Sequence, residues 1–410
     1  MDSRFTSEFF AGNRAKLREL FMGTAPIVVT GNGLLQRGGD STFPFAQDAN
    51  FWYLTGIDDP DVILVMEKDK EYLIVPARDH SREAFDGSID TEHLSERSGV
   101  KTVLNEKEGW EQLSGRVKKV KHVAILPAPP SYIEKIGLYT NPARARLIER
   151  LKSHKADLDL LDLSLHIVRQ RMIKQAPEIE AIQAAIDATI AGLRYVNRPS
   201  NREKYEHEYD MEADLTRSFR KQGTSGHAFE PIVASGERAC VLHNVANNGA
   251  LQTNDLIVLD VGAEVEHYAA DITRTISFGG SPSKRQQAVH GAVLDVQAYA
   301  FGLLKPGILL KDYEHEIELY MGEKLRELGL IKVIDHESVR EFFPHATSHF
   351  LGLNVHDVAD YDRPLEAGNV LTVEPGIYIS AEGIGVRIED DVLITEDGIH
   401  ILTDKLPREL

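Results

Sequence analysis

The sequence feature that most restricts the fold of this chain is an aspartate inside an otherwise apolar segment. Asp260 lies in LIVLDVG, residues 256–262, a run that is typical of a buried strand. An ionised carboxylate there is costly unless a cation or several donors meet it. Asp271 follows eleven residues later, and this odd separation would place the two side chains on opposite faces of one strand. A hairpin that turns at residues 264–268 removes the conflict and can bring the two aspartates together.

Two glutamates occupy similar positions further along the chain. Glu374 ends the apolar run VLTV before a Pro-Gly pair. Glu389 lies in VRIEDDVLI, where strand alternation places it on the same face as Arg387 and Asp391. Each acidic residue alone is most simply a solvated or ion-paired side chain. Four such carboxylates beside apolar residues fit an oxygen-rich metal site better than four separate accidents.

Three histidines, His345, His349 and His356, fall within twelve residues in HATSHFLGLNVH. The first two have the spacing of the HExxH zinc motif, but Ala346 stands where that motif requires glutamate, so this protease class is excluded. One imidazole added to four carboxylates gives too many ligands for one tetrahedral ion and about the right number for two metal ions. Such a donor set favours Mn²⁺, with Co²⁺, Zn²⁺ or Fe²⁺ as alternatives, and indicates hydrolysis.

Composition limits the remaining possibilities. The 410 residues exceed the usual length of one domain, and 42% hydrophobic residues are typical of a folded protein. A formal charge of −18 argues against nucleic acid as a partner. No signal peptide and no apolar run of about 18 residues is visible, so we expect no membrane partner and a cytoplasmic location. The single cysteine, Cys240, agrees with a reducing compartment.

Hydrophobic patterning predicts two domains that meet in the basic stretch at residues 169–174. The first reads as alternating strands and helices, and the second as long helices followed by mostly β structure. The elements predicted in the first domain are helices at 3–22 and 143–154 and strands at 27–29, 62–66, 72–75 and 122–126, the middle two forming a hairpin. In the second domain one long helix is predicted to begin at Pro177, and three further helices are predicted near residues 205–222, 283–304 and 311–328.

Four segments resemble the metal-site segments of the pita-bread metallopeptidases, the group of Xaa-Pro aminopeptidase, prolidase and methionine aminopeptidase. These segments are LDVGAEVEHYAADITRT, HATSHFLGLNVHD, LTVEPGIYI and GVRIEDDVLIT. In addition, FPFAQDANFWYLTGIDDPDVIL is similar to the creatinase-like N-terminal domain of aminopeptidase P. The resemblance implies an α/β N-terminal domain in residues 1–172 and an α+β pita-bread catalytic domain in residues 173–410. It also implies two divalent metal ions and five ligands, which are Asp260, Asp271, His349, Glu374 and Glu389.

The resemblance further implies roles for residues outside the ligand set. The catalytic residues implied are His243, which contacts the substrate near the scissile bond, His356, which stabilises the tetrahedral intermediate, and Glu374, which doubles as a proton shuttle. The substrate-binding residues implied are His345, Tyr378, Arg387 and Asp40. Asp40 matches an acidic residue that reaches the active site of a neighbouring subunit, which implies a homo-oligomer, either a dimer or a tetramer.

The implied activity is release of the N-terminal residue from peptides with proline in second position, through a hydroxide held between two metal ions. Only SAEGIG separates Tyr378 from Val386, whereas prolidases of the human type carry a longer insertion there, which favours the aminopeptidase. A prolidase remains an alternative, as do a non-catalytic binding protein and a metal-free creatinase-type hydrolase on the same fold. Ala346, Ala359 and Asn244 depart from the family pattern and concern the shape of the pocket.

Overall fold

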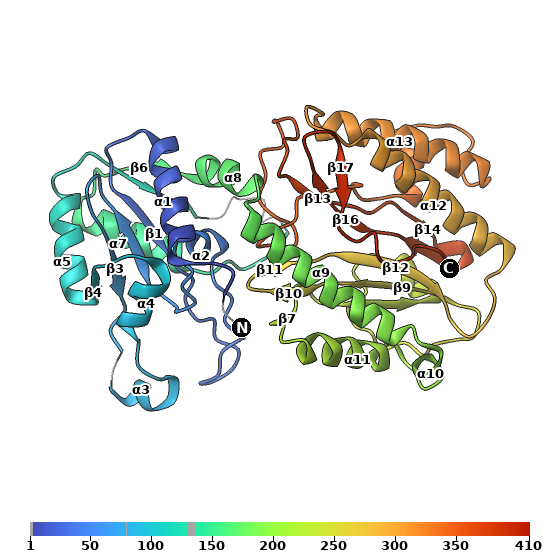
Figure 1. Ribbon diagram of the computed structural model, residues 1–410, viewed down its shortest axis with the longest axis horizontal. Helices are drawn as coiled ribbons and strands as arrows, with labels where there is room; N and C mark the ends of the chain where they lie inside the picture. The colour runs from blue at the N-terminus through green and yellow to red at the C-terminus, as the bar shows by residue number, and fades with distance from the viewer. Residues whose placement is uncertain (1–2, 79, 129–135) are drawn as a thin grey trace. The chain divides into compact units, whose positions relative to one another are not determined.

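The computed structural model describes residues 3–78, 80–128 and 136–410 (Figure 1). The chain divides into two compact units, residues 1–170 and 171–410. Strands and helices alternate in the first unit, whereas the second combines several small antiparallel sheets with long helices. The predicted fold class, an α/β part followed by an α+β part, is therefore confirmed. Within the described ranges, no helix combines the length and the hydropathy that crossing a membrane requires.

A central sheet organises the first unit and has, over the described residues, six strands in the order β4-β3-β2-β1-β5-β6. β2 runs antiparallel to both of its neighbours, and the other pairs are parallel. The predicted hairpin is confirmed by the pairing of β2 with β3, in which Ile63 lies opposite Ile74. The strands are β1 (Ile27–Thr30), β2 (Ile63–Met66), β3 (Glu71–Val75), β4 (Val103–Asn105), β5 (His122–Ile125) and β6 (Asp159–Asp162).

Helices pack on this sheet through an apolar core. Leu113 of α5 and Leu151 of α7 are buried in one cluster with the strand residues Val28 and Tyr72. The predicted helices at 3–22 and 143–154 correspond to α1 and α7, and the shorter helices between them were not predicted. The helices are α1 (Ser7–Phe21), α2 (Ala49–Thr55), α3 (His80–Asp86), α4 (Thr91–Ser98), α5 (Glu106–Val117), α7 (Ala143–His154) and α8 (Ser164–Met172), the last of which runs into the second unit.

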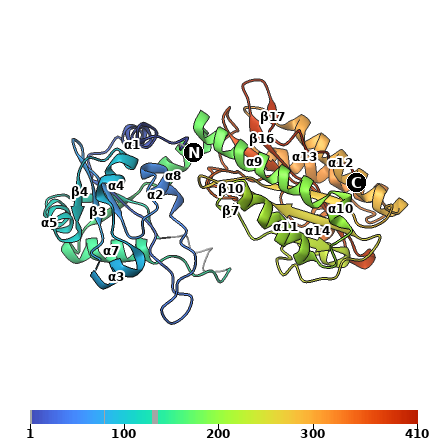
Figure 2. The ribbon, with the colours of Figure 1, turned by 60° about the horizontal axis from the view of Figure 1, so that its bottom comes forward.

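Two groups of helices support the sheets of the second unit. α9 packs against α11, and Figure 2 shows these two helices side by side. α12 packs against β13, β14 and β15, and α13 packs against α12 and α14. All four helices predicted for this half of the sequence are present, with ends within about three residues of the predicted ones. The helices are α9 (Ala176–Val196), α10 (Pro199–Arg202), α11 (Glu208–Lys221), α12 (Lys284–Leu303), α13 (Leu310–Glu327) and α14 (His336–Phe342).

Short antiparallel strands form the sheets of the second unit, in the orders β11-β10-β7, β12-β9-β8, β13-β16-β17 and β14-β15. The strands are β7 (Gly226–His227), β8 (Ile232–Ser235), β9 (Leu256–Val261), β10 (Ala263–Val265), β11 (Tyr268–Ala269), β12 (Ile272–Ser277), β13 (Val370–Val373), β14 (Gly376–Ile379), β15 (Ile384–Arg387), β16 (Asp390–Ile394) and β17 (Ile399–Ile401). Two short 3₁₀ helices, η1 (Gly236–Cys240) and η2 (Ser380–Glu382), join some of them.

The hairpin predicted between Asp260 and Asp271 is confirmed. β10 and β11 close it through a turn at residues 266 and 267, whose φ angles of 48° and 70° match a two-residue hairpin turn. Asp260 lies opposite Thr273 in the pairing of β9 with β12, so both side chains lie on one face of the sheet. Asp271 precedes Thr273 by two residues and therefore lies on that same face. Gly262 is required between β9 and β10, since a Cβ atom there would lie 1.7 Å from the carbonyl oxygen of Ala270.

Candidate metal centre

Four carboxylates reach one cavity from the ends of different strands. Asp260 lies in β9, Asp271 precedes β12, Glu374 follows β13 and Glu389 lies between β15 and β16. These side chains line a cavity of about 800 Å³ within the second unit. The sequence predicted that these four carboxylates beside apolar residues belong to one site, and the structure brings all four to one cavity.

Alternation suggested one continuous strand through residues 386–394, and this prediction is wrong. β15 ends at Arg387 and β16 begins at Asp390, and the two strands belong to different sheets. The break loses no backbone hydrogen bond, because the N–H of Ile388 donates to the carbonyl of Pro375 and the N–H of Glu389 donates to the carbonyl of Thr273. The break directs the side chain of Glu389 toward the hairpin that carries Asp260 and Asp271.

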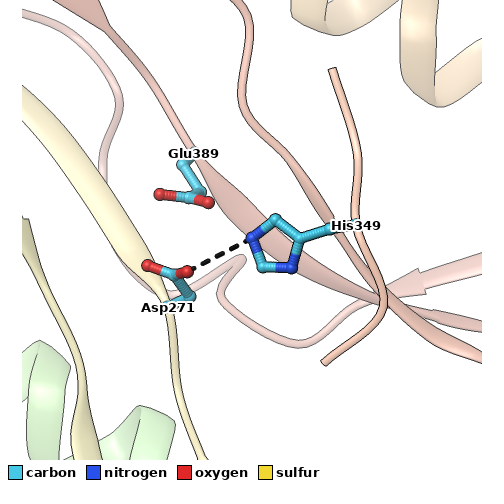
Figure 3. Close-up of side chains that lie close together, drawn as sticks. All are labelled: Asp271, His349 and Glu389. Carbon is cyan, nitrogen blue, oxygen red and sulfur yellow. Dashed lines mark ion pairs between the residues drawn. The ribbon is translucent and has the colours of Figure 1, made fainter. Parts of the chain in front are cut away.

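His349 supplies the imidazole of the cluster. Its Nε2 atom lies 3.5 Å from Oδ2 of Asp271 (Figure 3). The same atom lies 3.4 Å from Oε1 of Glu374. Donor atoms of Asp271, His349 and Glu389 all lie within 4.8 Å of one another. Nδ1 of His349 lies 3.0 Å from the carbonyl oxygen of Phe350, so the ring proton lies on that side and the Nε2 lone pair faces the carboxylates. This is the tautomer that a metal ligand requires.

The carboxylates are buried so closely together that they cannot all remain charged without added cations. Burial, reinforced by the neighbouring carboxylates, raises the pKa of Asp271 and of Glu374, and it raises the pKa of Glu389 to about 8. Arg387 donates to Oδ2 of Asp260 at 2.5 Å and balances one negative charge. The Oδ1 atoms of Asp260 and Asp271 are buried with no hydrogen-bond partner among the described residues. Unpartnered carboxylate oxygens beside a free imidazole nitrogen fit divalent cations.

A hydrogen-bonded chain connects three of the predicted substrate-side residues to this cluster. Arg387 Nη1 donates to the hydroxyl of Tyr378 at 2.9 Å, and that hydroxyl lies 2.8 Å from Nε2 of His345. Nδ1 of His345 lies 2.8 Å from the carbonyl oxygen of Ala346, so Nε2 is the acceptor for the tyrosine hydroxyl. Burial, and then the positive charge of Arg387, lower the pKa of His345 to about 3. His345 is therefore a neutral ring near pH 7.

The remaining predicted residues fall into two groups. His243 and His356 are exposed residues that line the same cavity, and the ring centroid of His356 lies 4.1 Å from that of His349. Desolvation in the cavity, and then His243, lower the pKa of His356, so its ring is neutral near pH 7. Asp40 lies in the first unit, in an exposed segment between β1 and α2. Its predicted role at a neighbouring active site stays a prediction.

The sequence did not reveal several residues that complete the site. Thr273 donates to Oε2 of Glu389 at 2.7 Å, and the N–H of Asp271 donates to Oδ2 of Asp391 at 3.1 Å. Alternation placed Asp391 on the face of Glu389 but gave no partner for it. Apolar side chains form much of the cavity wall, and no sequence pattern separates them from ordinary core residues: Phe229, Ile232, Leu242, Val245, Val355 and Tyr361.

Comparison with known proteins accounts for both units. Residues 180–396 match the model of metallopeptidase family M24, and residues 10–125 match that of the aminopeptidase P N-terminal domain. Xaa-Pro aminopeptidase of Haemophilus influenzae is 34% identical over 400 residues, which cover 92% of this chain and 89% of that protein. Among solved structures, Pseudomonas aeruginosa aminopeptidase PepP is 28% identical, with a TM-score of 0.87 over 99% of this chain and 97% of that chain. Escherichia coli aminopeptidase P with the inhibitor Pro-Leu is 29% identical, with a TM-score of 0.85 over 99% and 96%. The chain thus belongs to metallopeptidase family M24 and is a hydrolase with an aminopeptidase P type of N-terminal domain.

Proposed function

We propose that this protein is a metal-dependent aminopeptidase that releases the N-terminal residue of peptides with proline in second position. The observation that carries the proposal is the set of four carboxylates, three buried and one half-buried, that meet in one cavity around Nε2 of His349. Relatives named Xaa-Pro aminopeptidase match this chain over almost their whole length, and this match supports the choice of substrate.

We assign five residues as the ligands of two divalent metal ions, with Mn²⁺ as the first candidate and Co²⁺, Zn²⁺ and Fe²⁺ as alternatives. The ligands are Asp260, Asp271, His349, Glu374 and Glu389. Bound there, two ions would supply a hydroxide nucleophile near neutral pH and would polarise the scissile carbonyl. The unpartnered oxygens of Asp260 and Asp271 support their assignment as ligands.

The protein's own side chains would handle the proton and the developing negative charge. Glu374 lies between two histidines, 3.4 Å from Nε2 of His349 and 3.7 Å from Nδ1 of His345, and carries the proton to the departing proline nitrogen. His356 and His243 line the cavity, where each can donate an N–H to the substrate carbonyl as it becomes an oxyanion. The neutral state of His356 allows this without placing another charge in the site.

The shape and polarity of the cavity suit an X-Pro bond. The X-Pro amide nitrogen carries no hydrogen, so a peptidase that reads an extended backbone through that donor loses a contact. Here the wall residues Phe229, Val355 and Tyr361 offer apolar surface for the pyrrolidine ring. His345, held by Tyr378 and Arg387, supplies the fixed polar side of the same cavity.

A prolidase that accepts only Xaa-Pro dipeptides is the second candidate function. Its substrate carries a free carboxylate directly after proline, which requires a cationic partner. In this chain β14 and β15 are joined by residues 380–383, SAEG, which carry no basic side chain. This short connection favours substrates that continue beyond proline.

Asp40 and its surroundings support a homo-oligomer, which we propose to be a dimer or a tetramer. The segment between β1 and α2 exposes Leu34, Leu35 and Phe43 at 43%, 43% and 51%. Apolar side chains that cluster on one exposed loop are typical of an interface. If Asp40 contributes to an active site across that interface, Asp40→Ala lowers activity while light scattering reports an unchanged molecular mass.

The test of the function compares hydrolysis of an Xaa-Pro dipeptide with that of an Xaa-Pro-Yaa tripeptide, alongside measurement of bound metal. We expect two equivalents of metal per chain and preferred cleavage of the tripeptide, which Asp260→Ala abolishes. Strict preference for the dipeptide would identify a prolidase. Metal-loaded protein that cleaves neither peptide would identify a binding protein on this fold. Activity that is unaffected by Asp260→Ala and needs no metal would indicate a creatinase-type hydrolase.

A further inference from the structure

The segment from His345 to His349 has no regular secondary structure, yet its backbone is held firmly by helix α13. Glu314 projects from α13 and accepts three contacts from the segment. The N–H of Thr347 lies 3.1 Å from Oε1 and 2.9 Å from Oε2 of Glu314, and the N–H of Ser348 lies 3.0 Å from Oε1. A carboxylate that receives backbone N–H groups forms charge-assisted hydrogen bonds, which are stronger than neutral ones.

Two neighbouring contacts reinforce this attachment. The hydroxyl of Tyr313, the residue before Glu314, lies 3.0 Å from that of Ser348. Arg340 of α14 donates to the carbonyl oxygen of His345 at 2.5 Å and is itself held by Glu318 of α13 at 2.7 Å. The Glu314 carboxylate thus accepts hydrogen bonds from the backbone N–H groups of the segment, and the Arg340 guanidinium donates to the carbonyl at its beginning.

The two histidine rings at the ends of the segment follow the position of its backbone. Nδ1 of His345 lies 2.8 Å from the carbonyl oxygen of Ala346, and Nδ1 of His349 lies 3.0 Å from that of Phe350. Each ring is therefore hydrogen-bonded to the backbone carbonyl of the residue that follows the histidine. A shift of the backbone between the two residues moves both Nε2 atoms, one facing Tyr378 and the other facing the carboxylates.

The other side of the segment is hydrogen-bonded to the C-terminal end of strand β13. The N–H of Glu374 donates to the carbonyl of Thr347 at 2.8 Å, and the N–H of Thr372 donates to the carbonyl of His349 at 2.9 Å. The segment therefore lies between α13 and the strand that carries the glutamate of the site. Glu314 sets how closely the two histidines approach Glu374.

We propose that Glu314 is a positioning residue for both His345 and His349, through the N–H groups of Thr347 and Ser348. The inference rests on the proposed function, in which His349 binds metal and His345 lines the substrate pocket. Glu314 is not among the residues that line the cavity. It acts by fixing the distance between the two imidazoles and the carboxylates.

The test replaces Glu314 by glutamine and uses Glu316→Gln as the matched control. Glu316 lies two residues away on α13, is exposed, and loses the same charge. In Glu314→Gln one oxygen becomes an NH₂ group that faces the N–H of Thr347, so a donor meets a donor. We expect a 10- to 100-fold loss of Mn²⁺ affinity by titration calorimetry at 20 °C, the usual effect of losing a residue that orients a metal ligand. The visible spectrum of the Co²⁺-loaded protein should also change, and kcat/KM for a Xaa-Pro-Yaa tripeptide should fall about tenfold or more.

Glu314→Asp keeps the charge on a shorter side chain and should give a Mn²⁺ affinity and a kcat/KM between those of the wild type and Glu314→Gln. This variant tests the proposal if Glu314→Gln does not fold. The proposal is overturned if a folded Glu314 variant binds Mn²⁺ within threefold of the wild type and keeps its Co²⁺ spectrum, even when its melting temperature falls. A wild-type protein that binds metal but cleaves no proline peptide would refute the proposed function alone, because the affinity and the spectrum still report on Glu314.

Discussion

Replacing Asp357 by asparagine should destabilise the second unit strongly, because this carboxylate is the buried counter-ion of two cations. It follows His356 directly, and its side chain is 1% exposed. Arg171 Nη2 donates to one oxygen, and Nζ of Lys174 lies 3.0 Å from the other. Arg171 lies in the last turn of α8 and Lys174 in the connection between α8 and α9, so Asp357 attaches the loop of His356 to the beginning of the unit.

The expected cost follows from the burial of all three groups. Removing one partner of a buried ion pair typically costs about 3–5 kcal/mol, because the other charge stays buried without compensation. Glu178 is also buried nearby, and although burial raises its pKa, the charge of Lys174 opposes that rise, so Glu178 can offset part of the loss. We therefore expect about 3 kcal/mol. At roughly 2–4 °C per kcal/mol for a unit of this size, the melting temperature should fall by about 6–12 °C.

The assay is thermal unfolding followed by circular dichroism, with Asp362→Asn as the control. Asp362 is exposed and lies five residues along the chain, so its replacement should change the melting temperature by less than about 2 °C. An equally small change in Asp357→Asn would refute the reasoning, because it would mean that Arg171 and Lys174 do not depend on this carboxylate.

The same pair of proteins gives a pH dependence with a definite sign. Burial alone would raise the pKa of Asp357, but Arg171 and Lys174 outweigh it and hold this pKa below its ordinary value. A lowered folded-state pKa gives stability that is present above the unfolded value of about 3.9 and is lost as the pH falls through the folded value. The difference in the free energy of unfolding between the wild type and Asp357→Asn should therefore stay constant from pH 7 to about pH 5 and become smaller below about pH 4. A difference that widens on acidification would contradict this assignment.

Three further predictions concern the candidate metal centre. Chelation should lower the melting temperature by about 11–22 °C relative to protein with both ions at 100 times their dissociation constants, since two independent sites at that ratio contribute about 5.4 kcal/mol, or about 2.7 kcal/mol each; an unchanged midpoint would contradict the binding of ions. Glu374→Gln should lower kcat by about 10²–10⁴-fold for Xaa-Pro-Yaa peptides, whereas the exposed Glu323→Gln on α13 should not, and equal rates would exclude Glu374 as the proton carrier. Glu230 lines the cavity and is exposed, so its attraction for a cationic first residue of the substrate is weak. Glu230→Gln should lower the ratio of kcat/KM for Arg-Pro-Yaa to that for Gln-Pro-Yaa by at most about fivefold. A rise in this ratio would contradict the prediction.

The sequence predicted those parts of the fold that depend on local pattern. The hairpin between Asp260 and Asp271 could be predicted because alternation would place them on opposite faces of one continuous strand, a conflict that a hairpin removes. The long helices of the second unit could be predicted from periodicity together with proline and glycine at their ends. The break at residues 388 and 389 could not, because nothing local distinguishes it from a continuous strand. It depends on acceptors offered by Pro375 and Thr273, which are distant in sequence.

The same limit separates the proposed ligands from the residues that support them. Asp260 and Glu374 could be singled out because a carboxylate beside buried apolar residues is locally anomalous. Glu314 lies in an ordinary amphipathic helix, where a glutamate attracts no notice. Its importance arises only when α13 packs near the segment between His345 and His349. A sequence therefore reveals charged groups whose burial is energetically unfavourable. It does not reveal groups such as Glu314, whose burial is unremarkable and whose role is to hold another segment in place.

These observations explain how a cluster of like charges can be built into a stable fold. Burial, and then the charge of Asp260, raise the pKa of Glu389, so attraction among the four carboxylates cannot bring them together before cations bind. Backbone hydrogen bonds do so instead. Glu389 is attached through its N–H to Thr273, and Glu374 through its N–H to Thr347. Because these bonds do not depend on the charge of the side chains, the carboxylates can be assembled in protonated form and can release their protons when divalent ions bind.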